Sequence, residues 1–348
     1  MKIDILSGIQ PTGDLHLGNY FGAIANWVAL QDKYSCAYVV VDYHTLTMGV
    51  DAKSLWPRTR QMVVDLLACG IDPEKSIVFV QSLVPEHTEL FWILSCHCSF
   101  GELNRMTQFK DKSDDTDFVS AGLFAYPVLQ AADILAYRAT FVPVGKDQEQ
   151  HLELARSIVK RFNKCVGKNL FRSPQPLFTK TPKIMSLSDP TRKMSKSAGE
   201  KHYVGLFEDE SAIRKKVKTA VTDSGPQEGD AAISPGIANL LEILRATGRN
   251  EMASEFESEY RKQALKYAVL KENTADAIVE LSKCLKSRRE ELLSDSSYVD
   301  AVINEMGAKA RSVAKETLRD VREAMGFPTP PSPSVPTRVP VKTGSELD

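Results

Sequence analysis

The chain has 348 residues, more than one hydrophobic core usually supports, so two domains are expected. Lysines and arginines almost balance aspartates and glutamates, leaving a net charge of −1, which excludes a generally basic nucleic-acid binder and leaves only local basic patches for such a partner. No apolar run approaches the ~18–20 residues of a membrane helix, and the opening MKIDILSG resembles neither a signal peptide nor a transit segment, so we expect a cytoplasmic protein with no membrane partner.

The first 205 residues alternate between strand and helix patterns. Residues 2–7 alternate as a strand, and a turn follows before a helix-compatible stretch at 17–30. Runs of β-branched and aromatic residues predict further buried strands at 36–44, 76–82 and 140–145. Helical periodicity predicts helices at 52–69, 86–98, 123–138 and 147–162. This alternation favours an α/β fold with a Rossmann-like, doubly wound parallel sheet.

The strand pattern stops after about residue 205. Ile213, Val217 and Val221 recur every four residues beside a basic face, as in an amphipathic helix. Further helices are predicted at 236–247, 251–270, 274–293 and 297–326. We therefore expect an α/β nucleotide-binding domain at 1–205, a helical domain at 206–328 whose last helix can pack back on the first domain, and a disordered Pro- and Ser-rich tail at 329–348.

The six cysteines are scattered, which is typical of reduced thiols rather than of a disulfide framework. Cys96 and Cys98 flank a histidine, but side chains two positions apart on a helix point in different directions. No second ligand pair follows, so we expect no metal site on the protein itself.

The turn LSGIQPTGDLHLGNY, residues 6–20, follows the first predicted strand. In a doubly wound sheet it lies at the carboxyl ends of the strands, where ligands bind. Its glycines let the backbone approach a phosphate, and the next helix offers free N–H groups. Its spacing matches neither the dinucleotide fingerprint nor a Walker loop. His16 and Thr12 could donate to phosphate oxygens, although a histidine in such a turn, taken alone, is more often merely solvated.

A second feature is KMSKS at 193–197, two lysines bracketed by serines just past the sheet region. Cationic groups of this kind stabilise a leaving pyrophosphate, where negative charge accumulates in the transition state. Composition alone favours a solvated loop. The H-x-G turn near the N-terminus shifts the interpretation to a phosphate clamp.

HLGN and KMSKS, in this order across a parallel-sheet domain, resemble the class I aminoacyl-tRNA synthetases. The resemblance is to the tryptophanyl branch in its bacterial and organellar form and spans residue 5 to about residue 326. It rests on blocks that follow in the right order: SGIQPTGDLHLGNYFGAI, GELNRMTQFKDKS, YPVLQAADILAY, VPVGKDQEQHLELAR, KMSKS, AVTDS and PGIANLL.

This resemblance implies that ATP binds as Mg-ATP, with Mg²⁺ carried by the nucleotide. The catalytic groups, which also contact ATP, would be Thr12, His16, Lys193 and Lys196. Further ATP contacts would be Gln10, Pro11, Gly18, Asn19, Gly145, Lys146, Asp147, Ile184, Met194, Ser195 and Ser197. Asn19 stands where many class I enzymes have a second histidine, and it can still donate a side-chain N–H.

The same resemblance places Asp133 on the indole N–H of tryptophan. The indole nitrogen only donates, so its reader must be an acceptor, and a buried acceptor that phenylalanine leaves unpaired can discriminate by ~10⁴–10⁵. Leu6 and Gln130 would line the indole pocket, where an aromatic residue and methionine are more frequent in the family. The tryptophan ammonium and carboxylate would be held by Gln10, His44, Tyr126 and Gln148.

The implied activity is activation of L-tryptophan by ATP and its transfer to tRNA(Trp), with a homodimer and anticodon reading by the helical domain as family expectations. Basic segments at 156–164, 214–218 and 286–289 are candidates for tRNA contact. Three alternatives remain. These are a tyrosyl-tRNA synthetase, which the DQxxH and AADIL blocks disfavour; a small-molecule nucleotidyltransferase; and a non-catalytic RNA-binding paralogue.

Overall fold

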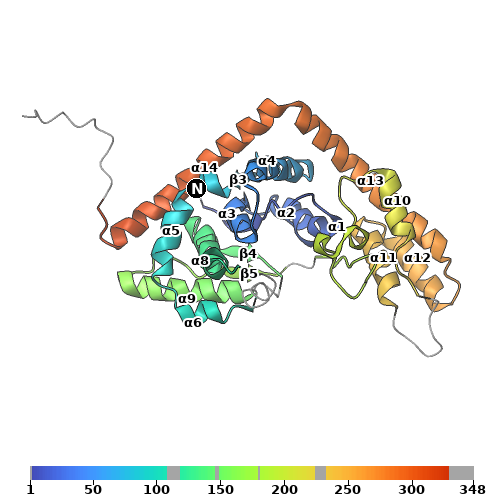
Figure 1. Cartoon of the computed structure of the whole chain (residues 1–348), viewed down its shortest axis with the longest axis horizontal. Helices are drawn as coiled ribbons and strands as arrows, with labels where there is room; N and C mark the ends of the chain where they lie inside the picture. The colour runs from blue at the N-terminus through green and yellow to red at the C-terminus, as the bar shows by residue number, and fades with distance from the viewer. Residues whose placement is uncertain (1, 108–117, 146–148, 179–180, 224–232, 329–348) are drawn as a thin grey trace, which may run out of the picture.

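The computed structural model describes residues 2–107, 118–145, 149–178, 181–223 and 233–328 (Figure 1). The predicted tail at 329–348 lies outside these residues, as do Lys146, Asp147 and Gln148. Within the described part of the chain, no helix is both long and apolar enough to cross a bilayer.

A five-stranded parallel sheet forms the centre of the N-terminal half, in the order β3-β2-β1-β4-β5. This confirms the predicted doubly wound α/β fold. The strands are β1 (Ile5–Ile9), β2 (Cys36–Val40), β3 (Ser76–Val80), β4 (Phe141–Pro143) and β5 (Gln175–Leu177). The chain runs outward to β3 on one side of β1 and to β5 on the other, so the strand order reverses between β1 and β4, where doubly wound sheets bind ligands.

Helices cover this sheet as the alternating pattern predicts. They are α4 (Ala52–Ala68), α5 (Glu86–Ser95), α6 (Phe100–Asn104), α8 (Ala121–Ala136) and α9 (Glu149–Val166). Helix α4 packs against β2 and β3, α9 packs against β5, and α8 lies against both α5 and α9. Tyr38 is fully buried in the sheet and stacks on Trp27, with ring centroids 5.0 Å apart.

The stretch 17–30 is helical, as predicted, but it is divided into α1 (Leu17–Asn19), a π-helical turn (Tyr20–Ile24) and α2 (Ala25–Leu30). Such π-turns recur at functional sites. The predicted strand at 36–44 ends at Val40, and its last residues form α3 (Asp42–Thr45), because the Asp42 carboxylate accepts hydrogen bonds from the backbone N–H groups of Tyr43 and Ser82 and turns the chain.

The described residues after 205 form no strand, and the helical prediction for this region is confirmed. The helices are α10 (Glu210–Lys218), α11 (Pro235–Ala246), α12 (Asn250–Arg261), α13 (Tyr267–Ser294) and α14 (Ser296–Ala324). The stripe predicted to include Val221 stops earlier, because α10 ends at Lys218 and the Val221 N–H donates to the Leu187 carbonyl instead. The break predicted near residue 272 lies at 262–266, where Gln263 adopts a positive φ of 57°.

Helices α13 and α14 form an inverted V in Figure 1. One arm, α13, packs against α10, α11 and α4, and the other, α14, runs back across β3 and α5. A single cluster of buried apolar residues extends from the sheet into these helices.

Candidate functional site

A cavity of about 1310 Å³ opens at the carboxyl ends of the strands. Gln10 follows β1, His44 lies just beyond β2, and Gly145 follows β4, so the sheet itself brings these residues to one edge. Nine of the residues predicted for the site line this cavity: Leu6, Gln10, Asn19, His44, Tyr126, Gln130, Asp133, Gly145 and Lys193.

The turn after β1 is held by a reciprocal cap at the start of α1. The Asn19 backbone N–H donates to His16 Nδ1 at 3.3 Å, and the His16 backbone N–H donates to Asn19 Oδ1 at 3.2 Å. Burial, together with the charges of Lys196 and Lys193, lowers the pKa of His16 to about 4. The imidazole is therefore neutral at pH 7. Because Nδ1 accepts, Nε2 carries the hydrogen and is available as a donor.

Gly18 is required by this cap. A Cβ at residue 18 would lie 3.0 Å from two atoms of the His16 ring and 3.3 Å from Cβ of Met194. Glycine thus allows the start of α1, the histidine ring and the KMSKS segment to approach one another closely.

The KMSKS segment reaches the N-terminal turn directly. Lys196 Nζ donates to the backbone carbonyls of Thr12 at 3.2 Å and Asp14 at 2.6 Å. Beyond the segment, Leu206 N–H donates to the Leu15 carbonyl and Leu17 N–H donates to the Val204 carbonyl. The two motifs are 173 or more residues apart in the sequence. They nevertheless form one structural unit beside the cavity, with Lys193 in the cavity wall.

Asp133 also lines this cavity, is 3% exposed and accepts three hydrogen bonds. His44 Nε2 lies 2.8 Å from Oδ2, while His87 Nδ1 at 2.6 Å and Gln81 Nε2 at 2.7 Å contact Oδ1. Burial raises the pKa of this carboxyl, but the hydrogen bonds from His44 and His87 outweigh burial and hold the pKa well below its usual range. Asp133 is therefore a carboxylate, and a carboxylate has about four acceptor positions, so one remains for a ligand donor.

Three members of this network were missed by the sequence analysis: Gln81, His87 and Tyr137. The Tyr137 hydroxyl lies 2.8 Å from His87 Nε2, and His87 Nδ1 faces Asp133, so the proton on Nδ1 points to the carboxylate and the tyrosine hydroxyl donates to Nε2. His87 lies in α5, 46 residues from Asp133 in the sequence. A histidine amid an apolar helix is a signal for such a role, but its partner cannot be read from spacing.

Apolar side chains line the same cavity as Asp133. They include Leu6, Val39, Val41, Ile134 and Val142. An apolar surface with one buried acceptor is suited to an aromatic ring that carries a single N–H or O–H donor.

The comparisons with known proteins agree with this geometry. The family described as tRNA synthetases class I (W and Y) matches residues 1–283. The chain belongs to this family of class I synthetases. A tryptophan–tRNA ligase from Clostridium tetani is 46% identical over 333 residues, covering 94% of this chain and 96% of the relative.

Solved synthetase structures have the same fold over nearly the whole chain. Tryptophanyl-tRNA synthetase from Campylobacter jejuni, complexed with ADP and tryptophan, is 33% identical with a TM-score of 0.81 and covers 93% of this chain and all of its own. The enzyme from Mycoplasma pneumoniae, also 33% identical, has a TM-score of 0.83, with coverage of 94% and 99%.

The remaining residues predicted from the synthetase family lie around the cavity rather than in its wall. They are Pro11, Thr12, His16, Gly18, Ile184, Met194, Ser195, Lys196 and Ser197. Ile184 and Met194 are buried, and the Met194 N–H donates to the Ile184 carbonyl. Ser195 and Ser197 are paired through their hydroxyls at 2.9 Å. The roles of these residues, and those of Lys146, Asp147 and Gln148 outside the described residues, stay predictions.

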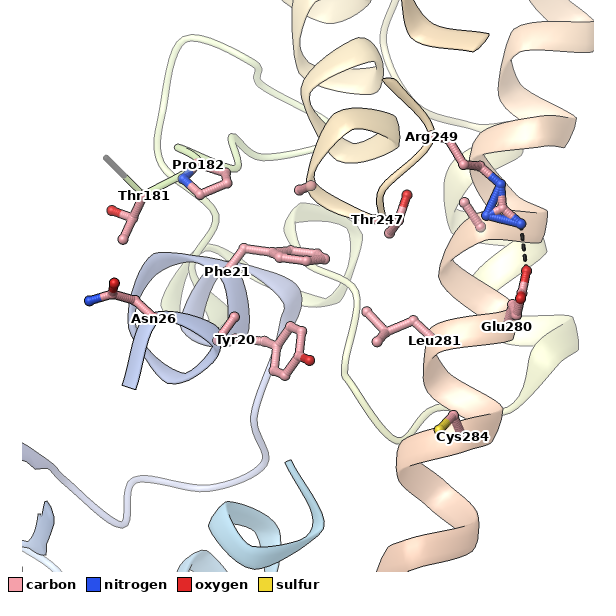
Figure 2. Close-up of a pocket in the computed structure, with 13 residues that line it drawn as sticks. Tyr20, Phe21, Asn26, Thr181, Pro182, Thr247, Arg249, Glu280, Leu281 and Cys284 are labelled. Carbon is pink, nitrogen blue, oxygen red and sulfur yellow. Dashed lines mark hydrogen bonds and ion pairs between the residues drawn. The ribbon is translucent and has the colours of Figure 1, made fainter. Parts of the chain in front are cut away.

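A second cavity of about 500 Å³ lies between the π-turn and the helices α11 and α13 of this synthetase (Figure 2). Tyr20 and Phe21 border it on one side, and an ion pair between Arg249 and Glu280 borders it on the other. None of the predicted site residues lines it, although it shares Asn26, Thr181 and Pro182 with the larger cavity.

Proposed function

We propose that this synthetase activates L-tryptophan with ATP and transfers it to the 3′ end of tRNA(Trp), releasing AMP and diphosphate. The observation that carries the proposal is the larger cavity. Buried Asp133 lines it together with apolar side chains, and Asn19 and Lys193 line the same cavity. The indole N–H takes the remaining acceptor position of Asp133, and the triphosphate extends toward Lys193 and Lys196.

The activation step needs no general base. The tryptophan carboxylate is ionised at neutral pH and attacks the α-phosphorus of ATP, so that diphosphate leaves and tryptophanyl-adenylate remains bound. Catalysis then depends on alignment and on charge stabilisation. Neutral His16 donates through Nε2, and the two lysines neutralise the charge that develops on the leaving group. A ribose hydroxyl of the tRNA then attacks the activated carbonyl.

Within the described residues, no three histidine, cysteine, aspartate or glutamate side chains gather into a metal site. Mg²⁺ would enter on the phosphate oxygens of ATP, where it would supply positive charge to the triphosphate. The groups of this chain that would donate to the phosphates are the side-chain N–H₂ of Asn19 and the ammonium groups of Lys193 and Lys196. Such donors are suited to binding an anion.

The structure narrows the basic surfaces available to tRNA. Arg161 pairs with Glu102, Arg214 with Glu210 and Asp276, Lys216 with Glu208, and Lys286 with Asp209. Other exposed cations of the three predicted segments are not part of these ion pairs and can contact a phosphate backbone. They are Lys160, Lys164, Lys215, Lys218 and Arg288. We assign anticodon contact to the helical domain, residues 206–328, and expect the protein in the cytoplasm with its tRNA.

A homodimer forms through the exposed apolar face around α5, α6 and the start of α8. Trp92 is 70% exposed, Phe100 is 73% exposed and Phe118 is 78% exposed, and Phe100 lies 4.9 Å from the ring of Phe124. Exposed aromatic residues of this kind are enriched at protein interfaces. Trp92→Glu is expected to convert the dimer to a monomer in sedimentation velocity. A wild-type protein that sediments as a monomer at all concentrations contradicts the dimer.

The function is tested by ATP–diphosphate exchange with each of the twenty amino acids, followed by charging of total tRNA. We expect exchange with tryptophan alone and labelling of tRNA(Trp). Exchange driven by tyrosine would identify the alternative synthetase, and an absence of exchange with every amino acid would identify a non-catalytic paralogue.

A further inference from the structure

Asn239 is a buried polar residue of α11 that makes two hydrogen bonds to the backbone of one residue, Met185. It is 4% exposed, its Nδ2 donates to the Met185 carbonyl at 3.0 Å, and its Oδ1 accepts from the Met185 N–H at 2.8 Å. The amide thus satisfies both backbone groups of Met185, as a neighbouring strand would.

Met185 lies in a short antiparallel hairpin that leads into KMSKS. Ser186 N–H donates to the Arg192 carbonyl, Met194 N–H donates to the Ile184 carbonyl, and Met185 pairs with Lys193 between these bonds. In such a non-hydrogen-bonded pair, the N–H and C=O of Met185 point away from its partner. Asn239 binds the outer side of the hairpin at the residue directly opposite Lys193.

The hairpin therefore connects α11 to the part of the cavity proposed for the triphosphate. Lys193 lines that cavity, and three residues later Lys196 donates to the carbonyls of Thr12 and Asp14. Without the Asn239 amide, the N–H and C=O of Met185 would lose their partners within the protein, and the hairpin would shift to reach others. Lys193 and Lys196 would shift with it.

We propose that Asn239 is a positioning residue for the activation step. Through the backbone of Met185, it fixes the hairpin that carries Lys193 and leads to Lys196. The inference rests on the proposed function and adds to it a residue of the helical region that controls the phosphate clamp without touching substrate.

The chain provides a matched control. Asn163 in α9 makes the same pair of hydrogen bonds to the backbone of one residue, with Nδ2 donating to the Phe171 carbonyl at 2.8 Å and Oδ1 accepting from the Phe171 N–H at 3.1 Å. Neither Asn163 nor Phe171 lines the larger cavity. Asn163→Ala therefore removes the same chemistry at a place unconnected with KMSKS.

The experiment compares Asn239→Ala and Asn163→Ala in steady-state ATP–diphosphate exchange, with equilibrium dialysis of tryptophan as a second readout. A misplacement of about 1 Å costs up to about a hundredfold in rate, so we expect Asn239→Ala to lower kcat/KM for ATP by about ten- to a hundredfold. The Kd for tryptophan should stay unchanged. Asn163→Ala should leave both quantities at the wild-type value. Equal kcat/KM for ATP in the two variants would overturn the inference, since it would leave Asn239 a stabilising residue only.

A double-mutant cycle with Lys196→Ala gives the second test. If Asn239 acts through the clamp, its substitution should have a several-fold smaller effect once Lys196 is gone, whereas multiplication of the two separate effects would contradict the proposal. Should Asn239→Ala fail to bind tryptophan, Asn239→Asp replaces it, because aspartate keeps the size and the acceptor for Met185 N–H. Failure of the proposed function is distinguishable, since wild type itself would then show no tryptophan-dependent exchange.

Discussion

The two regions of the larger cavity that we propose for tryptophan and for the triphosphate, called its tryptophan end and its triphosphate end, are built differently. At the tryptophan end, Asp133 is buried and accepts hydrogen bonds from His44, His87 and Gln81, with Tyr137 behind them. At the triphosphate end, Lys196 is held by two backbone carbonyls of the opposite loop. One end is a network in which each side chain fixes its neighbour, and the other is a contact between two loops.

This difference matches the function proposed for each end, which is discrimination between amino acids at one and binding of the triphosphate at the other. Discrimination requires an acceptor that cannot move to meet the wrong ring, because a site that can relax loses its selectivity. A clamp must instead exchange its carbonyl partners for phosphate oxygens when ATP binds. Lys196 can do this because its present partners, backbone carbonyls, are neutral acceptors that bind a cation less strongly than phosphate does.

The largest expected effect is at the tryptophan end. Asp133→Asn places an N–H₂ group among three donors and removes the charge, so we expect kcat/KM for tryptophan to fall by about 10³-fold or more. ATP binding without tryptophan should be unchanged. ATP–diphosphate exchange measures kcat/KM for tryptophan, and equilibrium dialysis measures the binding of ATP and of tryptophan. A tryptophan Kd equal to the wild-type value would show that Asp133 does not bind tryptophan.

The next effect is at the triphosphate end. Lys196→Ala is expected to lower the exchange rate by about 10²–10³-fold, the range seen when one group that stabilises transition-state charge is removed. The tryptophan Kd should be unchanged. Lys201→Ala, an exposed lysine in the next turn of the chain, serves as the control and should be neutral. A loss of tryptophan binding as large as the loss in rate would argue against the clamp.

The cap between the two ends predicts a pH dependence of stability. The pKa of His16 is about 4 in the fold, against 6.5 in the unfolded chain, so the folded state binds fewer protons in this interval. Its contribution to the free energy of unfolding is complete above pH 6.5 and is lost as the pH falls toward 4; it amounts to about 3 kcal/mol at most. Denaturant unfolding of wild type and His16→Asn between pH 7 and 4.5 should show a steeper decline for wild type. Parallel curves would contradict the burial of a neutral His16.

The smallest effect tests the depth of the network behind Asp133. Tyr137→Phe removes the hydroxyl that orients His87 but keeps the ring, so kcat/KM for tryptophan should fall about fivefold, corresponding to about 1 kcal/mol. Tyr260→Phe removes another buried hydroxyl, which donates to Asp223 in the helical region, and should leave tryptophan kinetics unaltered. If the two variants behave alike, the network does not extend beyond His87.

The contrast between a network of distant side chains and two continuous loops also explains which features could be predicted from the sequence. The alternating pattern was enough for the sheet and its helices, and β5 was missed because Gln-Pro-Leu is too short and too polar to indicate a strand. HLGN and KMSKS are each a continuous stretch of sequence, so the residues of each motif could be predicted from the sequence alone. Gln81, His87, Tyr137 and Asn239 act across 46 to 54 residues, and no local pattern reveals a hydrogen bond between distant segments.

The most direct test of the account is a crystal structure with tryptophan and a non-hydrolysable ATP analogue. The account predicts the indole nitrogen within hydrogen-bond distance of the Asp133 carboxylate and the terminal phosphates beside Asn19, Lys193 and Lys196. A nucleotide seated instead in the smaller cavity between Tyr20 and Arg249, or phosphates remote from both lysines, would contradict it.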